Sequence, residues 1–413
     1  MKYEFKTNID QKEYDKFVKS FSSTTFMQTS SWGKVKKAWH SSLVGMYQDG
    51  KLVAASQILK RNLFLGKKLF YIPRGFVIDY KDKNLLKEFV NNLKSYAKKD
   101  GAIDIKIDPF ICFSEDNIQN IRKNKGLKVR ELYTKDTKEI VNNLKKLGFV
   151  HAGYKKEVNA YIQPRYTMAI SLKDSDGKFY DKESLRRTFP KNTRNYIGKY
   201  QEERGVEFSY SKDKEDVKDL IKMLNCTEKR QHIALRSEKY FKEVMNNFPL
   251  NAVLFFARVD IDKYIIFLKN DMKEHENKKE FCEKQIIEAK KIKEIYGNKP
   301  LAGATIVMMP TCKKGIKTAS FLYAGTNTEI LPTLKITNGL MFYRLCYCLD
   351  NGCDYCDLGG IDGSLNDHLS TFKSKFNPNV LELVGEYDLV INKFMYKTFN
   401  ILMKIRKYIM SKR

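Results

Sequence analysis

The chain has 413 residues, a length typical of about two or three domains, and 42% of them are hydrophobic, which is enough for cores of that size. No run approaches the roughly 18 apolar residues of a transmembrane helix, and the N-terminus has no apolar signal core, so we expect a cytoplasmic protein. The net charge of +27 favours a polyanionic partner, such as RNA, anionic lipid or a phosphorylated substrate, although a lysine-rich proteome would produce the same excess.

Hydrophobic spacing predicts alternating helices and strands along the chain. In the first half, helices are expected at 11–20, 83–98, 115–125 and 136–147. The strands of that half are expected at 43–47, 52–60, 68–72 and 103–107. In the second half, we expect strands at 163–172 and 252–259 and a helix at 213–231.

Two stretches, one starting at Lys51 and one at Lys299, share the same pattern. Each has an apolar strand, a basic turn with glycine, and a second strand with aromatic residues. A helix then ends at a glycine, Gly101 or Gly352, before a short strand with acidic residues. Repeats separated by roughly 250 residues are typical of duplicated domains. The chain is therefore predicted to contain two copies of one α+β unit.

The two copies are expected at residues 1–150 and 151–387, with a ligand-binding cleft between them. The second copy carries an insertion at 262–297, where two apolar stripes flank a short polar break. This pattern predicts an antiparallel helical hairpin, a short coiled-coil arm. The first copy has only a tight turn at 49–50 at the equivalent point.

The C-terminal segment, residues 388–413, has no acidic residue after Asp388 and repeats apolar residues along one side. Its basic residues are Lys393, Lys397, Lys404, Arg406, Lys407, Lys412 and Arg413. A helix here can pack its apolar face on the first copy, or it can present a basic amphipathic face to an anionic membrane. The two alternatives are compatible.

Four of the eight cysteines lie close together in the sequence. Cys353 and Cys356 have a spacing typical of zinc sites, but Cys346 and Cys348 fall on nearly opposite faces of a predicted helix. We therefore interpret all four as packing residues and expect no metal site.

Other signs of nucleophilic or nucleotide chemistry are missing from the sequence. There is no Ser/His/Asp arrangement, and the run around Gly359 and Gly360 lacks the Lys-Ser/Thr ending of a phosphate-binding loop. We interpret that run as a turn at the rim of the cleft, and we expect no cofactor.

Several motifs, taken in their order and spacing, resemble the Fem family of aminoacyl-tRNA-dependent peptidoglycan transferases over nearly the whole chain. They include Phe26-MQTSSWGKVK, Tyr71-IPRGFVIDY, Ile105-KIDP, Gln163-PR, Phe321-LYAGTN, Cys356-DLGGIDG and Phe372-KSKF. The resemblance implies two tandem acetyltransferase-like (GNAT-like) domains with an inserted coiled-coil arm. It also implies transfer of an amino acid from charged tRNA to the stem peptide of a cell-wall precursor.

This chemistry fits the absence of a catalytic nucleophile. An aminoacyl ester on tRNA is already activated, so an amine of the peptide can attack its carbonyl carbon directly. The enzyme has to align the substrates, help to remove a proton and stabilise the oxyanion. Aminoacyl-tRNA is then a co-substrate.

By resemblance, Lys36 and Arg236 bind phosphates of the precursor, with Tyr240 beside them and Arg74 also contacting substrate. Arg236 and Tyr240, four residues apart, are expected on one helix face. The alternative for this region is an exposed basic helix. Asp108 is implied to be a catalytic acid that holds or deprotonates the amine, although it can equally cap a turn.

The resemblance further implies that Lys373 is catalytic and meets the tRNA end or the oxyanion. Phe372 would stack on the terminal base, and Tyr323 would face the cleft or belong to the core. The basic residues expected to follow the tRNA backbone are Arg186, Arg187, Lys191 and Arg194, for which a solvated basic helix is an equal alternative.

The sequence therefore predicts a cytoplasmic, peripherally membrane-associated aminoacyltransferase of interpeptide-bridge synthesis. Its expected partners are aminoacyl-tRNA and lipid II or UDP-MurNAc-pentapeptide, and glycine, alanine or serine is the expected amino acid. One alternative is a non-catalytic RNA- or membrane-binding protein with the same twin fold. Another is an aminoacyl-tRNA-dependent transferase with a different acceptor. The oligomeric state stays open.

Overall fold

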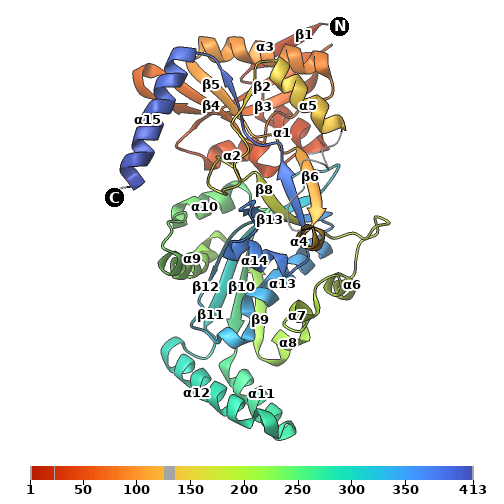
Figure 1. Cartoon of the computed structure of the whole chain (residues 1–413), viewed down its shortest axis with the longest axis vertical. Helices are drawn as coiled ribbons and strands as arrows, with labels where there is room; N and C mark the ends of the chain where they lie inside the picture. The colour runs from red at the N-terminus through yellow and green to blue at the C-terminus, as the bar shows by residue number, and fades with distance from the viewer. Residues whose placement is uncertain (1, 23, 125–134, 412–413) are drawn as a thin grey trace.

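Two mixed β-sheets follow one another along the long axis of the molecule and are flanked by helices (Figure 1). This computed structural model describes residues 2–22, 24–124 and 135–411. The last residue of the helix expected at 115–125 lies outside the described residues, as do Lys412 and Arg413. The architecture confirms the α+β class expected from the sequence.

The first sheet has seven strands in the order β1-β2-β3-β4-β5-β15-β7. Strands β4 and β5 run parallel, and the other pairs run antiparallel. The strands are β1 (Tyr3–Thr7), β2 (His40–Gln48), β3 (Lys51–Asn62), β4 (Lys68–Ile72), β5 (Ala102–Ile107), β7 (Val150–His151) and β15 (Tyr387–Val390). The helices of this half are α1 (Gln11–Ser20), α2 (Ser30–Val35), α3 (Lys83–Lys99) and α5 (Lys135–Lys146).

Helix α3 connects the parallel strands β4 and β5, because parallel neighbours need a crossover connection. Asp82 caps its N-terminus by accepting the backbone N–H of Leu85. Leu86, Phe89 and Leu93 recur at helical spacing and are fully buried in the core of the first sheet.

The second sheet has eight strands in the order β6-β14-β8-β13-β12-β11-β10-β9. They are β6 (Cys112–Asn117), β8 (Tyr166–Ser171), β9 (Val206–Ser211), β10 (Ala252–Val259), β11 (Leu301–Met308), β12 (Thr318–Thr326), β13 (Tyr355–Ile361) and β14 (Asn379–Leu383). The remaining helices are α4 (Ile118–Lys123), α6 (Lys182–Arg187), α7 (Lys191–Arg194), α8 (Lys199–Glu203), α9 (Val217–Gln231), α10 (Glu238–Asn247), α11 (Ile261–Glu274), α12 (Lys279–Tyr296), α13 (Ile336–Asp350), α14 (His368–Ser374) and α15 (Lys393–Ser411).

The predicted repeat is visible in the strand order. Strands β2-β3-β4-β5 and β10-β11-β12-β13 each contain antiparallel neighbours followed by a parallel pair that a helix connects. Gly101 and Gly352 precede the last strand of their units with φ values of 78° and 67°. Glycine adopts this left-handed conformation without strain, which explains why both copies place it where the helix turns back into the sheet.

Each sheet also contains a strand contributed from the other part of the chain. Strand β6 pairs with β14 in the second sheet, and β15, near the C-terminus, inserts between β5 and β7 in the first. The helix predicted at 115–125 therefore starts too early, because residues up to Asn117 pair with β14 and α4 begins only at Ile118. The boundaries at 150 and 387 stay predictions, and the exchanged strands show that the two halves are interlocked.

The insertion in the second copy forms two helices, α11 and α12, at the end of the molecule opposite the N-terminus (Figure 1). They lie between β10 and β11, where the first copy has a tight turn. Tyr264, Leu268, Cys282 and Ala289 are buried and join the core of the second sheet. A helical hairpin is thus present, while its description as a coiled coil stays a prediction.

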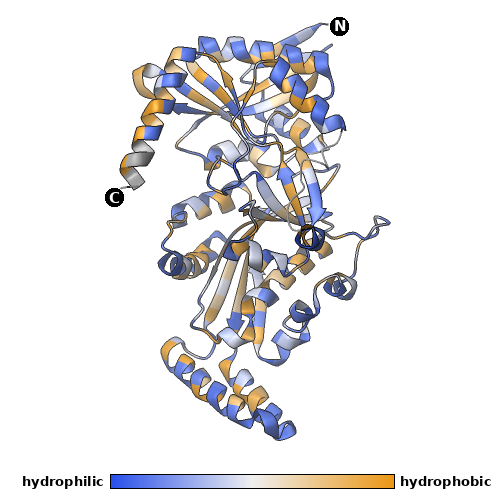
Figure 2. Cartoon of the chain, viewed as in Figure 1, coloured by the Kyte–Doolittle hydropathy of each residue, from blue (hydrophilic) through white to orange (hydrophobic). Residues whose placement is uncertain are grey.

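Hydrophobic side chains form a core at each sheet and a third cluster where the halves meet. The ribbon coloured by hydropathy shows many hydrophobic residues along the strands of both sheets (Figure 2). The third cluster joins Phe26 and Trp32 of the first half to Phe241 and Phe248 of the second. The ring centres of Phe26 and Phe248 are 6.1 Å apart. The two halves therefore share a core.

Helix α15 begins beside the first sheet and then extends along the outside of the molecule (Figure 1). Met395 is buried, and the Tyr396 hydroxyl donates a hydrogen bond of 2.6 Å to the Asp388 carboxylate. Within the described residues, no helix combines the length and apolar character needed to cross a membrane.

Candidate active site

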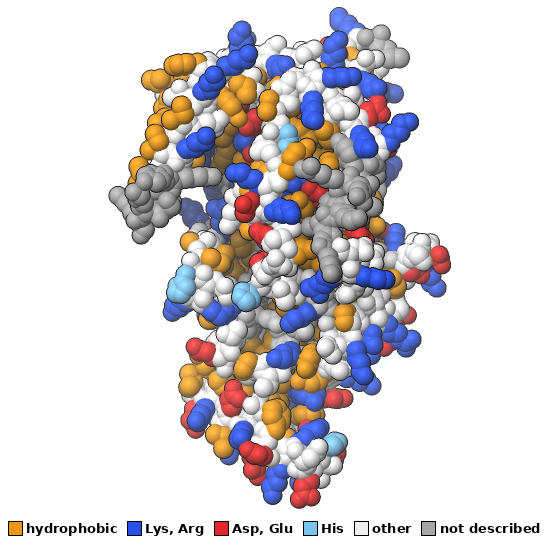
Figure 3. All heavy atoms as spheres, viewed as in Figure 1, with side chains coloured by type: hydrophobic (Ala, Val, Ile, Leu, Met, Phe, Trp, Pro, Cys, Tyr) orange, Lys and Arg blue, Asp and Glu red, His pale blue; other side chains and the backbone are white. Residues whose placement is uncertain are grey.

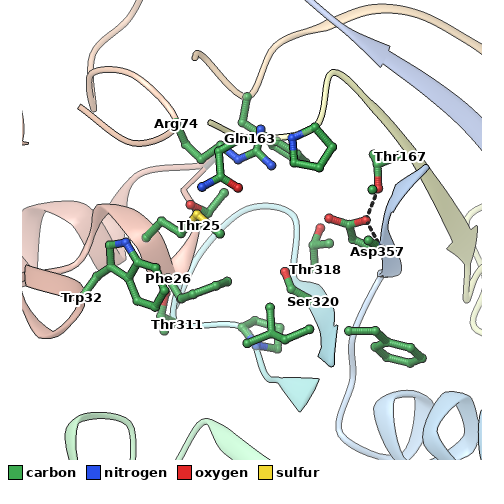
Figure 4. A pocket seen from close by; sticks show the side chains of 18 of the residues that line it. Thr25, Phe26, Trp32, Arg74, Gln163, Thr167, Thr311, Thr318, Ser320 and Asp357 are labelled. Carbon is green, nitrogen blue, oxygen red and sulfur yellow. Dashed lines mark hydrogen bonds between the residues drawn. The ribbon is translucent and has the colours of Figure 1, made fainter. Parts of the chain in front are cut away.

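A cavity of about 490 Å³ lies between the two halves of the chain (Figure 4). The first half contributes the segment at 24–36 and Arg74 to its lining. The second half contributes Tyr240 together with residues of β12 and β13. This volume is typical of sites for small molecules or for parts of larger substrates.

Two cations, Lys36 and Arg236, line one end of the cavity. The Lys36 ammonium lies 4.4 Å from the ring centre of Trp32 and 5.3 Å from that of Tyr240. The Arg236 guanidinium lies 5.4 Å from the Tyr240 ring centre. Neither cation forms an ion pair with a carboxylate in the described part of the chain. Burial, reinforced by repulsion from Arg236, lowers the pKa of Lys36 to about 8, so a bound anion would be stabilised here.

Arg236 does not lie on a helix with Tyr240. Helix α10 begins at Glu238 with Ser237 as its N-cap, so the predicted shared helix face is wrong. The hydroxyl of Ser237 caps the first turn and thereby fixes where the helix starts. The loop before α10 still places the guanidinium over the Tyr240 ring, so the two residues do belong to one site.

Asp108 lies beneath the cavity wall rather than in its lining. Its side chain accepts a 2.7 Å hydrogen bond from the Tyr71 hydroxyl and a 2.5 Å hydrogen bond from the backbone N–H of Arg74. These bonds hold Arg74 at a φ of 60°, which is uncommon for a residue other than glycine. The Arg74 side chain lines the cavity, with its guanidinium 5.2 Å from the ring centre of Phe110. Burial raises the pKa of Asp108 to about 6.

The equivalent tyrosines of the two copies have different surroundings. Tyr323 is half-buried on β12 and lines the cavity, with its ring centre 5.1 Å from that of Phe241. Tyr71 on β4 is buried and donates its hydroxyl to Asp108. Only the second copy therefore uses this position to form the cavity wall.

Lys373 and Phe372 lie on α14, behind the cavity wall. Lys373 is only 6% exposed, and its ammonium donates hydrogen bonds of 2.9 Å to the carbonyl oxygens of Gly359 and Gly360. Burial lowers the pKa of Lys373 to about 8. The Phe372 ring packs against Phe376, with their ring centres 5.8 Å apart. Gly359 and Gly360 line the cavity in front of α14, whereas Phe372 and Lys373 do not line it.

Asp357 is a cavity-lining acid that the sequence analysis did not single out. It lies on β13, whose pairing with β8 shifts register between Asp357 and Gly360. One oxygen of its carboxylate, Oδ1, accepts hydrogen bonds from the Thr167 hydroxyl and from the backbone N–H of Gly359 (Figure 4). The only signal in the sequence is an acid directly before the Leu-Gly-Gly run, because glycines are common at such bulges.

Of the four basic residues expected to contact tRNA, two lie on α6 and two on α7, and none of them lines the cavity. Arg186 pairs with Glu183 and donates to the backbone carbonyl of Arg194, so its side chain stabilises the helix pair. Arg194 donates to backbone carbonyls of the same segment. Arg187 and Lys191 are exposed, which leaves them accessible to a polyanion.

The clustered cysteines Cys346, Cys348, Cys353 and Cys356 are all buried. Three of them belong to the core of the second sheet. Among the described residues, no group of three or more His, Cys, Asp or Glu side chains is placed to hold a metal ion.

Solved structures with the same architecture define the class of protein. The crystal structure of FemX superposes with a TM-score of 0.74 at 22% identity, covering 96% of this chain and 99% of that one. A tandem GNAT protein from the clavulanic acid biosynthesis pathway superposes with a TM-score of 0.50 at 9% identity, covering 94% and 99%. The chain therefore has a tandem GNAT-like fold, as expected from the sequence.

The sequence comparisons then identify the family. Residues 9–284 and 267–404 match the FemAB family, to which this chain belongs. The lipid II:glycine glycyltransferase of Staphylococcus haemolyticus is 25% identical over 429 residues, covering 95% of this chain and 94% of that protein. The enzyme of the same name from Staphylococcus aureus (strain MSSA476) is 26% identical over 426 residues, with the same coverage. As a FemAB family member, the chain is an aminoacyl-tRNA-dependent transferase, so the non-catalytic alternative is set aside.

Proposed function

We propose that this enzyme transfers a small amino acid (glycine, alanine or serine) from aminoacyl-tRNA to a stem-peptide amine of a peptidoglycan precursor. The acceptor would be lipid II or UDP-MurNAc-pentapeptide, in the synthesis of the interpeptide bridge. The observation that carries this proposal is the cationic end of the cavity. There Lys36 and Arg236 have no carboxylate partner in the described chain, and both candidate acceptors contain a diphosphate.

The cavity suggests how the acceptor binds. The diphosphate would lie against the partly buried Lys36, where burial strengthens the contact, and against the exposed Arg236, and Tyr240 would donate its hydroxyl. Burial raises the pKa of Tyr240, which keeps that hydroxyl protonated. Arg74 and Tyr323 would then border the path of the stem peptide toward the other end of the cavity.

In the reaction, the acceptor amine attacks the ester carbonyl carbon of the aminoacyl-tRNA. A C–N bond forms, the ester C–O bond breaks, and the tRNA 3′ end leaves as a hydroxyl group after taking up a proton. We propose that Asp108 and Lys373 support this step indirectly: Asp108 fixes the turn at Arg74, and Lys373 fixes Gly359 and Gly360. Phe372 would support α14 in the same way.

The tRNA is proposed to bind outside the cavity. Arg187 and Lys191 are exposed, and the net charge of +27 favours contacts to a phosphate backbone. Arg186 and Arg194 would keep the two short helices in place.

The inner face of the cytoplasmic membrane is a further proposed partner, because α15 exposes an apolar side (Figure 3). Phe394 is 75% exposed, Ile401 59% and Ile405 50%. Lys397 and Lys404 flank these residues on the helix and would meet anionic lipid headgroups. This placement would bring the enzyme to a lipid-linked acceptor.

The direct test is transfer of radiolabelled glycine, alanine and serine from charged tRNA to lipid II and, separately, to UDP-MurNAc-pentapeptide. Mass analysis of a product heavier by one or more residues would name both the amino acid and the acceptor. If neither acceptor gains mass while tRNA still binds, the proposed acceptor is wrong.

The membrane contact predicts that the double substitution I401E/I405E weakens binding to phosphatidylglycerol vesicles by roughly 10- to 100-fold, because two apolar side chains are lost from the contact. Vesicle co-sedimentation measures the change. The matched control is L65E/L250E, which adds the same charge at two exposed leucines outside α15, 82% and 77% exposed. If both variants lose vesicle binding to the same extent, α15 is not the part of the protein that contacts the membrane.

A further inference from the structure

The cavity has one acidic wall. Among the described residues that line it, Asp357 is the only carboxylate. Figure 4 shows it on the side opposite Trp32, whose ring contacts Lys36 at the cationic end. Lys36 and Arg236 therefore lie at one end of the cavity and the carboxylate at the other, and Arg74 lies between Trp32 and Asp357 in Figure 4.

The geometry of Asp357 leaves one oxygen available to a ligand. Both hydrogen bonds from the Thr167 hydroxyl and from the Gly359 N–H go to Oδ1. The other oxygen, Oδ2, accepts no hydrogen bond from the described part of the chain, and in Figure 4 it points into the cavity. The two bonds to Oδ1 fix the orientation of the carboxylate, so its free oxygen is presented in one direction.

Two hydroxyl groups lie next to this oxygen. Thr318 and Ser320 are two residues apart on β12, so they point to the same face of the sheet, and Ser320 pairs with Asp357 across the parallel strands. Both side chains line the cavity and are half-buried, and neither hydroxyl has a hydrogen-bond partner among the described residues. In Figure 4 they lie on the same wall as the carboxylate.

This wall thus offers three acceptor oxygens: Oδ2 of Asp357 and the hydroxyl oxygens of Thr318 and Ser320. A primary ammonium group has three N–H donors and one positive charge, so it matches the three oxygens in both number and charge. A phosphate or carboxylate group would instead be repelled by Asp357.

We propose that Asp357, Thr318 and Ser320 form a binding site for a primary ammonium group of a substrate. The inference rests on the proposed function, which supplies two such groups. One is the α-ammonium of the amino acid on tRNA, and the other is the stem-peptide ammonium of the acceptor.

Lys373 is a positioning residue for this site. Its ammonium holds the carbonyl oxygens of Gly359 and Gly360, where β13 departs from regular pairing with β8. Gly359 has a φ of 84°, and its N–H is one of the two donors that orient Asp357. A buried cation thus fixes the strand bulge that in turn fixes the cavity carboxylate.

The test measures equilibrium binding of matched probes to the full-length wild type and to D357N. In the acceptor arm, UDP-MurNAc-pentapeptide is compared with the same compound N-acetylated on its stem-peptide amine. In the donor arm, glycyl-tRNA is compared with N-acetylglycyl-tRNA. Acetylation removes the charge and two N–H donors and adds a small neutral acetyl group, and the comparison with D357N separates the effect of charge from that of size.

We expect the wild type to bind the free-amine form roughly 10- to 100-fold more tightly than the acetylated form in one arm, as is typical of a charge-assisted hydrogen bond. D357N should reduce that preference to about twofold or less in the same arm, because asparagine has no charge. If D357N loses the preference for the free amine in the acceptor arm, the site binds the stem-peptide ammonium. If it loses that preference in the donor arm, the site binds the ammonium of the transferred amino acid.

The matched control is D362N, which removes the same charge from a nearby carboxylate that caps a turn and does not line the cavity. It should keep the wild-type preference in both arms. The variant T318V/S320A leaves the carboxylate in place and should lower the preference by about 3- to 10-fold, which provides a second readout if D357N fails to fold.

An unchanged preference in folded D357N, or a wild type with no preference in either arm, overturns the ammonium site while leaving the proposed function intact. Failure of the proposed function looks different: neither form of either probe binds. In that case the ammonium site is rejected together with it.

Discussion

The two ends of the cavity are built in different ways. At the cationic end, Lys36 comes from the first half of the chain and Arg236 from the second. Both are long side chains beside aromatic rings, and neither is part of a sheet. At the acidic end, Asp357, Thr318 and Thr167 lie on neighbouring strands of one sheet, in the order β8-β13-β12. One end depends on how the halves meet, and the other depends on strand register.

This difference indicates a division of tasks. Cations on long side chains can reach a diphosphate whose position varies with the rest of the substrate, and they bind it mainly through charge. A carboxylate held by two hydrogen bonds suits a group that has to lie close to the reacting atoms, because small displacements there are costly for the rate. The substitutions below separate the two ends.

The largest effect is expected at the cationic end. In K36M/R236Q, binding of UDP-MurNAc-pentapeptide should weaken by roughly 1,000-fold, because two charge-assisted hydrogen bonds to phosphate are lost and each contributes about 1.5–3 kcal/mol. Titration calorimetry measures the change. Wild-type affinity should also fall as pH rises through about 8, where Lys36 loses its proton, and should fall with added salt.

The control for this pair is K34M, on the short helix α2 that ends just before Lys36, because Lys34 is exposed and outside the cavity lining. It should bind the precursor like the wild type. If K36M/R236Q also keeps wild-type affinity, the diphosphate does not bind at this end.

A smaller effect is expected from Asp108, which supports the cavity from below. Its pKa is about 6 in the folded chain and about 3.8 in an exposed carboxyl, so between these values the folded state keeps a proton that the unfolded state loses. The free energy of unfolding should therefore fall as pH rises from 4 to 6 and then level off. In D108N this contribution disappears. The difference in the free energy of unfolding between D108N and the wild type should therefore change by roughly 3 kcal/mol between pH 4 and pH 6.

Urea denaturation at pH 4, 5, 6 and 7 measures this difference. The control is D79N, at an exposed aspartate before α3. Its free energy of unfolding, plotted against pH, should run parallel to that of the wild type. A D108N curve that is also parallel would show that folding does not raise the pKa of this carboxyl.

The smallest effect is expected from K373M, which removes the ammonium behind the acidic end. The carbonyl oxygens of Gly359 and Gly360 lose their buried donor, so the free energy of unfolding should fall by about 2 kcal/mol. Chemical denaturation checks the value, with K375M, at the exposed lysine that follows the last residue of α14, as the control. Wild-type stability in K373M would mean that the bulge in β13 does not depend on this lysine.

Much of the fold was predictable because it depends on the spacing of hydrophobic residues within short segments. The helix at 11–20 and the strand at 68–72 have the bounds expected from spacing alone, and the repeat follows from hydrophobic order and two glycines. Strand β6 was missed because its partner, β14, lies more than 250 residues further along the chain, and local spacing carries no trace of that pairing.

The candidate site was predictable only where a motif names the residue. Lys36, Arg236 and Tyr240 do meet at one end of the cavity, although Arg236 reaches it from a loop. The direction of Asp357 depends on a register shift in β13 and on a hydroxyl from β8, which no spacing rule encodes. For the same reason, the sequence could not show that Lys373 lies behind the cavity wall.

The exchanged strands have a consequence for how the chain acquires its structure during synthesis. Strand β15 lies between β5 and β7, so the first sheet stays incomplete until residues 387–390 have left the ribosome. The edge of β5 is therefore open while most of the protein is being made, and an open edge is a template for wrong pairing. Nascent chains that stop before Tyr387 should need a chaperone to stay unaggregated, even though they already contain the whole cavity.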